Sequence, residues 1–361
     1  MTNRQEKPKI LIIEDTPEHI HILIECLHEE FSITAATDGG RAWQFLQDHI
    51  KPDLILLDVI MPGLDGYEIC KKLKADARTR DIPVIFMSAL IEEQDERRGL
   101  EIGGVDYISK PLRPALVRAR IRNQLELKRH RDHLEEVVKE RTRELLLTQD
   151  AAILGLGILA EFRDTETGMH IRRTQSYVGL LARHLQKTPK YASLFTDETL
   201  HLLIQSSPLH DIGKVGIPDS ILRKPSALTR EEFQCIKQHT LYGRDVLQRI
   251  EATMQDNAAS AFLRFAKEIA YTHHECWDGS GYHGMKGEEI PLSGRLMAVA
   301  DVYDALTSKR AYKEAFTHDE ALRIMTKGDG RTHPDHFDPD ILQSFIELNE
   351  SFRDISKRYQ D

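Results

Sequence analysis

The first 125 residues alternate short apolar runs with amphipathic stretches. Apolar runs occur at residues 9–13, 54–57, 83–87 and 105–108, with a weaker run at 31–36. Amphipathic stretches, such as residues 17–30 and 40–50, lie between them. Short, almost continuous apolar strands separated by helices are typical of a parallel sheet that is covered on both faces. The pattern predicts a doubly wound α/β domain over residues 9–125, preceded by a tail at residues 1–8.

Residues 114–150 contain no glycine, and proline occurs only at their first position. They are dense in Arg, Lys, Glu and Leu, which predicts one long linker helix. A possible seven-residue rhythm of apolar residues runs along it through Leu127, Leu134, Val138 and Leu145. Arg131 and Arg141 fall on the same seam, so a single solvated helix held by ion pairs stays an alternative to a coiled coil. We expect a parallel homodimer, because an unpaired charged helix of this length would gain little stability.

Beyond residue 150 the strand pattern gives way to long stretches with a helical period. They cover residues 171–185, 199–209, 261–274, 294–308 and 339–352. An all-α domain is therefore predicted over residues 151–361. The whole chain is expected to contain an α/β domain, a long connecting helix and an all-α domain.

Composition narrows the range of partners. The 361 residues are 40% hydrophobic and 30% charged, as in a globular protein, and the net charge is −9. A binder of a nucleic-acid polymer or of a membrane surface would need a basic face, so we expect neither partner. The apolar run at residues 151–160 is too short to span a membrane, and the N-terminus lacks the apolar core of a signal peptide. Four scattered cysteines without a CxxC pair predict a reduced, cytoplasmic protein.

Polar side chains follow the predicted strands of the first domain. Glu14 and Asp15 follow the first strand, Asp58 the third, Ser88 the fourth and Lys110 the fifth. In parallel sheets of this kind, functional groups collect where the strands end. Carboxylates that converge there repel one another unless a hard cation such as Mg²⁺ neutralises them. Such a cation would also shield a phosphoryl group on Asp58, whose oxygens Ser88 and Lys110 could bind.

These residues, together with the segment DVIMPGLDG that begins at Asp58, resemble the receiver domain of two-component response regulators. The resemblance covers about residues 8–125 and implies a flavodoxin-like fold. It implies that Asp58 is the phosphoacceptor for a cognate sensor histidine kinase and that Glu14, Asp15 and Asp58 hold Mg²⁺. It also implies that three residues report phosphorylation: Ser88, Tyr107 and Lys110. A half-buried edge aromatic explains Tyr107 equally well.

The predicted helical domain carries a spaced series of imidazoles and carboxylates. The series is Glu166, His170, His210, Asp211, His239, His273, His274 and Asp301. Glu166 and His170 would share one helix face, and Asp301 lies in an apolar run where an uncompensated carboxylate is costly. Nitrogen and oxygen donors without thiolate suit Fe, Mn, Zn or Ni. Eight donors are too many for one ion, so two or three are expected, which together can activate water and polarise a phosphoryl oxygen.

Several motifs in this region resemble the HD-GYP family over about residues 150–355. They are ETGMH at 166–170, HDIGK at 210–214, HHE at 273–275, DGSGY at 278–282, DVYDAL at 301–306, SKRAYK at 308–313 and HFD at 336–338. The resemblance implies a helical HD-superfamily fold that holds two or three ions, often iron or manganese. It implies hydrolysis of cyclic di-GMP to linear pGpG, with further hydrolysis to GMP left open.

The family resemblance also implies roles for individual residues. The eight donors above become metal ligands, and the catalytic residues are His210, Asp211 and Lys214. The substrate contacts are expected from Lys214, Gly281, Tyr282, Asp304, Arg310 and Lys313. Guanidinium and ammonium groups suit the phosphates of such a substrate.

Two loops depart from the family pattern. Gly-Tyr-Pro is replaced by Gly-Tyr-His at residues 281–283, and Arg-Pro-Tyr-Lys by Arg-Ala-Tyr-Lys at 310–313. Loss of proline frees a φ angle and restores an N–H, so both loops are expected to be more mobile. His283 could add a metal ligand or a phosphate donor, but we expect it to be an exposed loop residue. The cluster from His333 to Asp338 looks like a second metal site, but His336-Phe-Asp-Pro matches the family's C-terminal motif, so we expect no second site there.

Three functions remain open. The first is a phosphorylation-regulated cyclic di-GMP phosphodiesterase. The second is a catalytically weak module that binds a cyclic dinucleotide and acts through contacts with partner signalling proteins. The changed Gly-Tyr-His loop favours that second function, whereas the complete ligand set and Lys214 count against it. The third keeps the chemistry but changes the substrate to a nucleotide monophosphate, (p)ppGpp or another cyclic dinucleotide.

Overall fold

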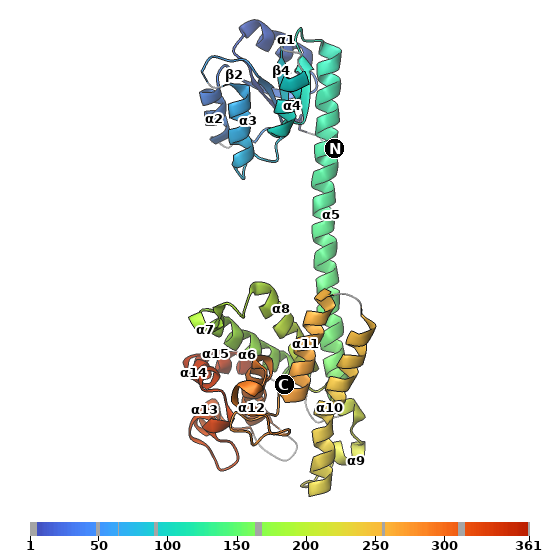
Figure 1. The fold of residues 1–361 in the computed structure, drawn as a ribbon, viewed down its shortest axis with the longest axis vertical. Coiled ribbons are helices and arrows are strands. Elements are labelled where there is room, and N and C mark those ends of the chain that lie inside the picture. Colours follow the sequence, from blue (N-terminus) through green and yellow to red (C-terminus); the bar gives the residue numbers. More distant parts are fainter. Residues whose placement is uncertain are drawn as a thin grey trace. The chain divides into compact units, whose positions relative to one another are not determined.

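A computed structural model of the chain describes residues 6–47, 51–63, 65–89, 93–162, 168–254, 257–309 and 315–359. The chain divides into two compact units, Met1–Thr142 and Arg143–Asp361. One continuous helix, α5 (Pro114–Glu161), passes through this division (Figure 1). Among the described residues, no helix combines the length and the apolar character needed to cross a membrane.

The first unit is built on a five-stranded parallel sheet in the order β2-β1-β3-β4-β5. The strands are β1 (Lys9–Ile13), β2 (Ser32–Ala36), β3 (Leu54–Asp58), β4 (Val84–Ser88) and β5 (Asp106–Ser109). The helices between them are α1 (Pro17–Leu27), α2 (Gly39–Gln47), α3 (Gly66–Ala75) and α4 (Glu93–Glu101). All five predicted strands are present, each within one residue of its predicted bounds, and the predicted doubly wound fold is confirmed.

Helices cover both faces of this sheet, as the apolar strands predict. Along β1, Leu11 and Ile13 pack with residues of α2 and α3, whereas Ile10 and Ile12 pack with α1 and the start of α5. The alternation follows from the two-residue period of a strand. Two apolar layers therefore support the edge of the sheet at which the strands end. At this edge the carboxyl ends of β1 and β3 lie in register, with Ile13 opposite Leu57.

Helices make up the second unit, and none of its described residues forms a strand. The α-helices are α6 (Gly168–Gln186), α7 (Pro189–Ala192), α8 (Asp197–Ser206), α9 (Asp219–Leu222), α10 (Arg230–Thr253), α11 (Asn257–Thr272), α12 (Leu292–Thr307), α13 (His318–Lys327), α14 (Pro339–Glu347) and α15 (Asn349–Arg358). Short 3-10 helices are η1 (Ser207–Leu209), η2 (Ile212–Gly216), η3 (Gly287–Glu289) and η4 (Pro334–His336). The prediction of an all-α domain is confirmed.

A cluster of stacked aromatic rings centres the larger core of this unit. Tyr177 of α6 stacks on Phe352 of α15 with ring centroids 4.6 Å apart, and Tyr303 of α12 meets Phe352 edge-on at 5.2 Å. The rings join three helices that are distant in sequence, and α6 and α12 both carry residues of the site. Phe352 can reach this core because the chain turns at Leu348, between α14 and α15. The single helix predicted over residues 339–352 is therefore wrong.

Two other predicted helix ends differ from the structure. The stretch 199–209 leaves the α-helix after Ser206 and continues as η1, because Pro208 has no N–H for the next helical hydrogen bond. The linker helix was expected to end near residue 150, but α5 continues through the apolar run to Glu161. Ile153 and Ala160 are buried in the second unit, with Ile153 packing against α10 and α11. The apolar run is thus a docking face of α5.

Candidate metal centre and receiver site

Four buried histidines of the second unit turn their Nε2 atoms toward one another in pairs. The Nε2 atoms of His170 (α6) and His210 lie 3.3 Å apart, and those of His239 (α10) and His273 are also 3.3 Å apart. All four side chains are almost completely buried. Imidazole nitrogens that converge in this way are suited to hold cations between them.

The opposite ring nitrogen of each histidine is hydrogen-bonded to an acceptor. The bonds to backbone carbonyls are His210 Nδ1 to Ser207 O (3.1 Å), His239 Nδ1 to Ile236 O (2.7 Å) and His273 Nδ1 to Ile269 O (3.0 Å). A carbonyl oxygen only accepts, so Nδ1 carries the proton and Nε2 of the neutral ring keeps its lone pair. This is the tautomer that binds a metal through Nε2.

His170 is oriented by a buried ion pair instead of a carbonyl. Its Nδ1 donates to Asp304 Oδ2 at 2.7 Å, and Arg173 donates to both oxygens of Asp304, at 2.7 and 3.0 Å. Burial raises the pKa of Asp304, but His170 and Arg173 together bring it below its usual value. Asp304 is completely buried, so it orients a histidine, whereas the family resemblance implied that it contacts substrate. Sequence reasoning missed Arg173, although the spacing His-x-x-Arg places it one helical turn after His170.

Asp211 joins two groups of metal-ligand atoms. One group contains Glu161, His170, His210 and Asp211, and the other contains Asp211, His239, His273 and His274, with the atoms of each group within 4.8 Å of one another. Asp211 Oδ2 lies 3.2 Å from His210 Nε2, and Oδ1 lies 3.2 Å from His239 Nε2. A carboxylate with one oxygen in each group is placed to bridge two cations.

Lys214 lies next to this carboxylate. Its Nζ is 2.8 Å from Asp211 Oδ2, one turn of η2 away. Although burial opposes ionisation, Lys214 and His210 keep the pKa of Asp211 well below its usual value. The bridging position is therefore an anion at neutral pH, with a cation beside it that could contact a phosphate.

Close backbone packing sets the distance between Asp211 and His239. A Cβ on Gly213 would lie 1.9 Å from the carbonyl oxygen of His239 and 2.5 Å from the nitrogen of Gly243. Only glycine fits there, so the segment that follows Asp211 lies directly on α10. The capping box of Thr229 and Glu232 begins this helix and supports the position of His239 along it.

Glu161 is a member of the site that the sequence did not reveal. Only 1% of its surface is exposed, and its Oε1 lies 3.5 Å from His170 Nε2 and 3.9 Å from His210 Nε2. Burial raises its pKa to about 7. The one signal was a carboxylate that directly follows an apolar run.

The other expected ligands and contacts divide into two groups. Asp301 of α12 is near the first group, with Oδ1 3.7 Å from His170 Nε2. Glu166, Arg310 and Lys313 lie outside the residues that the structure describes. Their expected roles therefore stay predictions.

At the edge of the sheet in the first unit, the three predicted carboxylates converge. Oxygens of Glu14, Asp15 and Asp58 lie within 4.8 Å of one another. Lys110 Nζ is 2.8 Å from Asp58 Oδ2 and 2.9 Å from Glu14 Oε2. Burial raises the pKa of Asp58, whereas Lys110 and His19 lower that of Glu14 despite its burial. One lysine faces two buried carboxylates and Asp15 lies nearby, an arrangement suited to a divalent cation.

The predicted switch residues lie behind this cluster. Ser88 is fully buried at the end of β4, and Tyr107 of β5 is buried with its hydroxyl 2.6 Å from that of Tyr67. Tyr67 also donates to the carbonyl of Asp95 at 3.0 Å. In this conformation Tyr107 is thus a buried aromatic with a specific partner on α3.

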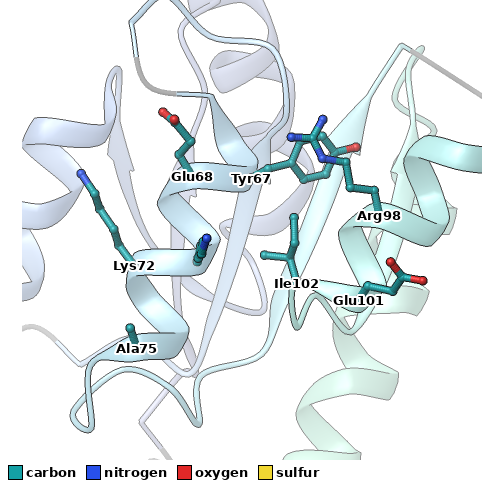
Figure 2. Close-up of a pocket in the computed structure, with 8 residues that line it drawn as sticks. Tyr67, Glu68, Lys72, Ala75, Arg98, Glu101 and Ile102 are labelled. Carbon is teal, nitrogen blue, oxygen red and sulfur yellow. The ribbon is translucent and has the colours of Figure 1, made fainter.

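A groove adjoins that partner on the surface of the first unit. It lies between α3 and α4 and has a volume of about 850 Å³. Figure 2 draws the lining residues and labels seven of them: Tyr67, Glu68, Lys72, Ala75, Arg98, Glu101 and Ile102. The guanidinium of Arg98 lies over the ring of Tyr67, 4.6 Å from its centroid. Tyr67 therefore contacts both α4, through Arg98, and Tyr107 of β5.

Comparison with known proteins assigns each of the two units to a domain family. Residues 10–122 match the response regulator receiver domain, and residues 169–341 match the HD domain. A probable cyclic di-GMP phosphodiesterase of Vibrio cholerae is 43% identical over 360 residues, which cover 98% of this chain and 80% of that protein. The chain belongs to the response regulators that carry an HD-GYP phosphodiesterase domain.

Two further relatives share both parts of this architecture. A cyclic di-GMP phosphodiesterase of Thermotoga maritima is 34% identical, with 98% of this chain and 93% of that protein covered. The cyclic di-GMP phosphodiesterase response regulator RpfG of Xanthomonas campestris is 36% identical over 82% of this chain and 75% of its own length. The second unit is thus a phosphodiesterase domain of the HD-GYP type.

The donor set of this HD-GYP domain fits bound transition-metal ions. Asp211 Oδ1 and both oxygens of Glu161 are buried and accept no hydrogen bond from any residue that the structure describes. Buried carboxylate oxygens without a partner are costly unless a cation compensates them. Imidazole and carboxylate donors without cysteine suit iron or manganese better than a soft-ligand metal.

The Gly-Tyr-His loop of this HD-GYP domain is anchored at its changed position. The N–H of His283 donates to Oε1 of buried Glu275 at 2.7 Å, a bond that proline cannot make. The His283 ring stacks on Tyr271 at 4.3 Å, and its Nε2 lies 2.9 Å from Thr240 Oγ1. The prediction of an exposed His283 is wrong, because the restored N–H and the ring both have partners in the fold.

The two preceding residues bring this loop against the metal-ligand histidines. A Cβ on Gly281 would lie 2.5 Å from Cα of Glu275, so the loop can approach only with glycine there. Tyr282 then packs on His274, with ring centroids 4.6 Å apart. Lys237 Nζ lies over the Tyr282 ring, 4.7 Å from its centroid. Gly281 and Tyr282 therefore lie beside the metal-ligand histidines, where a contact with substrate was predicted.

Proposed function

We propose that the chain is a phosphorylation-regulated, metal-dependent phosphodiesterase that hydrolyses cyclic di-GMP to pGpG. The observation that carries the proposal is Asp211, whose two oxygens face two separate groups of histidines held in the metal-binding tautomer. Two cations held by these groups would supply Lewis acidity and activate water for attack on a phosphodiester. The relatives that share both domains are named as cyclic di-GMP phosphodiesterases.

The chain's own residues would divide the remaining work. Lys214 lies partly buried beside Asp211 and offers a charge-assisted hydrogen bond to a phosphoryl oxygen. Tyr282 packs on His274 beside the site and would contact the substrate. Arg173 and Asp304 would keep His170 in one orientation during turnover. Arg310 and Lys313 stay proposed contacts for substrate phosphate.

Metal content and substrate choice test this function together. Protein purified anaerobically without chelator should contain at least two transition-metal ions per chain by elemental analysis, iron or manganese by expectation. It should convert cyclic di-GMP to pGpG, measured by product chromatography against other cyclic dinucleotides, (p)ppGpp and nucleotide monophosphates. One ion or fewer per chain would contradict the proposed metal centre. Tight binding of cyclic di-GMP without turnover would instead support the binding-module alternative.

We also propose that α5 forms a parallel homodimer. The seam residues predicted from the sequence are exposed in the single chain: Leu127, Leu134 and Val138 at 62% and Leu145 at 71%. Apolar side chains at this spacing are stabilised when a second helix covers them. Analytical ultracentrifugation of the wild type should give a dimer, and Leu134→Glu with Leu145→Glu should give a monomer. A monomeric wild type at micromolar concentration would exclude the dimer.

A further inference from the structure

Glu161 is the last residue of α5 and lies inside the metal site. Its carboxylate belongs to the same group as His170, His210 and Asp211, with ligand atoms within 4.8 Å of one another. Both of its oxygens are buried without a hydrogen-bond donor among the described residues. A glutamate with only a structural role would bond to a backbone N–H or pair with a cation of the protein.

The end of α5 is held against the metal site by small and apolar residues on one face. A Cβ on Gly157 would lie 2.5 Å from the carbonyl oxygen of Pro208 in η1, two residues before His210. Ile153 lies one turn earlier in a core with α10 and α11, and Asp150 accepts a hydrogen bond from Gln205. Glu161 follows Gly157 by four residues, so it lies on the same helix face and next to the metal-ligand histidines.

We propose that Glu161 is a metal ligand and that through it helix α5 acts directly on the metal centre. The proposal rests on the metal-dependent function above, and it adds a ligand outside the family motifs that the sequence contains. An oxygen donor joins the imidazoles of His170 and His210, a set that suits manganese or iron. Asp211 then completes this group and connects it to the second group.

The other end of the same helix belongs to the receiver core. Val117, Ile121 and Leu125 are buried against strands of the sheet. A helix is stiff along its axis, so a shift or rotation of α5 at the receiver would move the carboxylate at residue 161 relative to the histidines, which other helices hold. Phosphorylation at Asp58 would in this way change how tightly the first group binds its ion. By linkage, metal bound at Glu161 would equally favour one state of the receiver.

Glu161→Gln tests the ligand without changing the size of the side chain. Full-length protein is stripped of metal and titrated with Mn²⁺ alone, and bound manganese is counted by elemental analysis after dialysis. The variant should bind one ion fewer per chain, or bind it at least about 10- to 100-fold more weakly, the range seen when even a supporting group is lost. Its metal-free melting temperature should not fall, because the amide removes an uncompensated buried charge.

Two further variants make the result specific. Glu140→Gln makes the same change at an exposed position of α5 and should match the wild type in Mn²⁺ content and affinity. Glu161→Asp keeps a carboxylate and should bind more tightly than Glu161→Gln, which shows that the charge at this position matters. Unchanged content and affinity in folded Glu161→Gln would overturn the ligand assignment. A wild type that binds Mn²⁺ but leaves cyclic di-GMP intact would defeat only the proposed function.

The action of α5 is tested by the effect of phosphorylation on metal affinity. With Mg²⁺ present throughout, acetyl phosphate should change the Mn²⁺ dissociation constant of the wild type by about 5-fold or more, a typical coupling between sites. Asp58→Asn serves as the unphosphorylated blank. In Glu161→Gln, acetyl phosphate should leave the Mn²⁺ dissociation constants of the remaining ions unchanged. Equal dissociation constants with and without acetyl phosphate in the wild type would overturn this coupling.

Discussion

Asp211→Ala should reduce hydrolysis of cyclic di-GMP by at least about 10²–10³-fold, the usual loss when a central electrostatic group of an active site is removed. The reason is the position of Asp211 between the two ligand groups. Its Oδ1 lies 3.2 Å from His239 Nε2 and 3.5 Å from His273 Nε2, while its Oδ2 lies 3.2 Å from His210 Nε2. No other described residue is shared by both groups.

Removal of this carboxylate also takes away an anion that contacts Lys214. Nζ of Lys214 is 2.8 Å from Asp211 Oδ2, in a region from which water is largely excluded. The site would then lose an anion that attracts metal ions and retain a cation that repels them. Metal content should therefore fall together with activity in Asp211→Ala.

The measurement is one purification series with metal analysis and product chromatography. Lys214→Ala should keep its metal and lose much of its turnover, so that it falls between Asp211→Ala and the wild type. In Asp211→Ala the receiver should still accept phosphate from acetyl phosphate, which shows that the receiver is folded. Wild-type turnover in Asp211→Ala would refute the catalytic assignment.

Asp58→Asn should abolish labelling of the chain by acetyl phosphate and Mg²⁺. A phosphoryl group forms its acyl bond with a carboxylate oxygen, and the asparagine amide is not a nucleophile of this kind. The neighbouring groups would remain, because Lys110 keeps its contact with Glu14 at 2.9 Å. Loss of labelling would thus come from the acceptor itself.

Stability provides a control for Asp58→Asn. Asp58 is buried beside Glu14 and Asp15, and its pKa is raised by burial, so its charged form is disfavoured in the fold. The neutral amide should leave the melting temperature of the metal-free protein unchanged or higher. Metal content in the HD-GYP domain should be that of the wild type, and a basal hydrolytic rate should remain. Equal incorporation of phosphate by wild type and variant would remove Asp58 from its proposed role.

Local sequence patterns were sufficient for the architecture and for most of the candidate ligands. Continuous apolar strands and amphipathic helices predicted the sheet, because both faces of each strand must be buried. The motifs of the family, which follow one another along the chain, identified four histidines as candidate ligands: His170, His210, His239 and His273. Sequence alone also placed the acids of the receiver, since parallel strands end at a common edge.

Tertiary structure decided which groups support these residues. Arg173 and Asp304 meet across 131 residues of sequence, so no local pattern could show that they orient His170. The anchoring of His283 depends on Glu275, Tyr271 and Thr240. A change from proline predicts a freer loop only until the new N–H finds a buried acceptor.

The end of α5 shows the same limit most clearly. Composition predicted the charged part of the helix, but residues 151–160 have no polar face by which their surroundings could be inferred. Their role emerges only when Gly157 lies against the carbonyl oxygen of Pro208 and the next turn carries Glu161 toward His170 and His210. A buried carboxylate is identified as a candidate ligand by its neighbours in space, and packing between separate helices decides those neighbours.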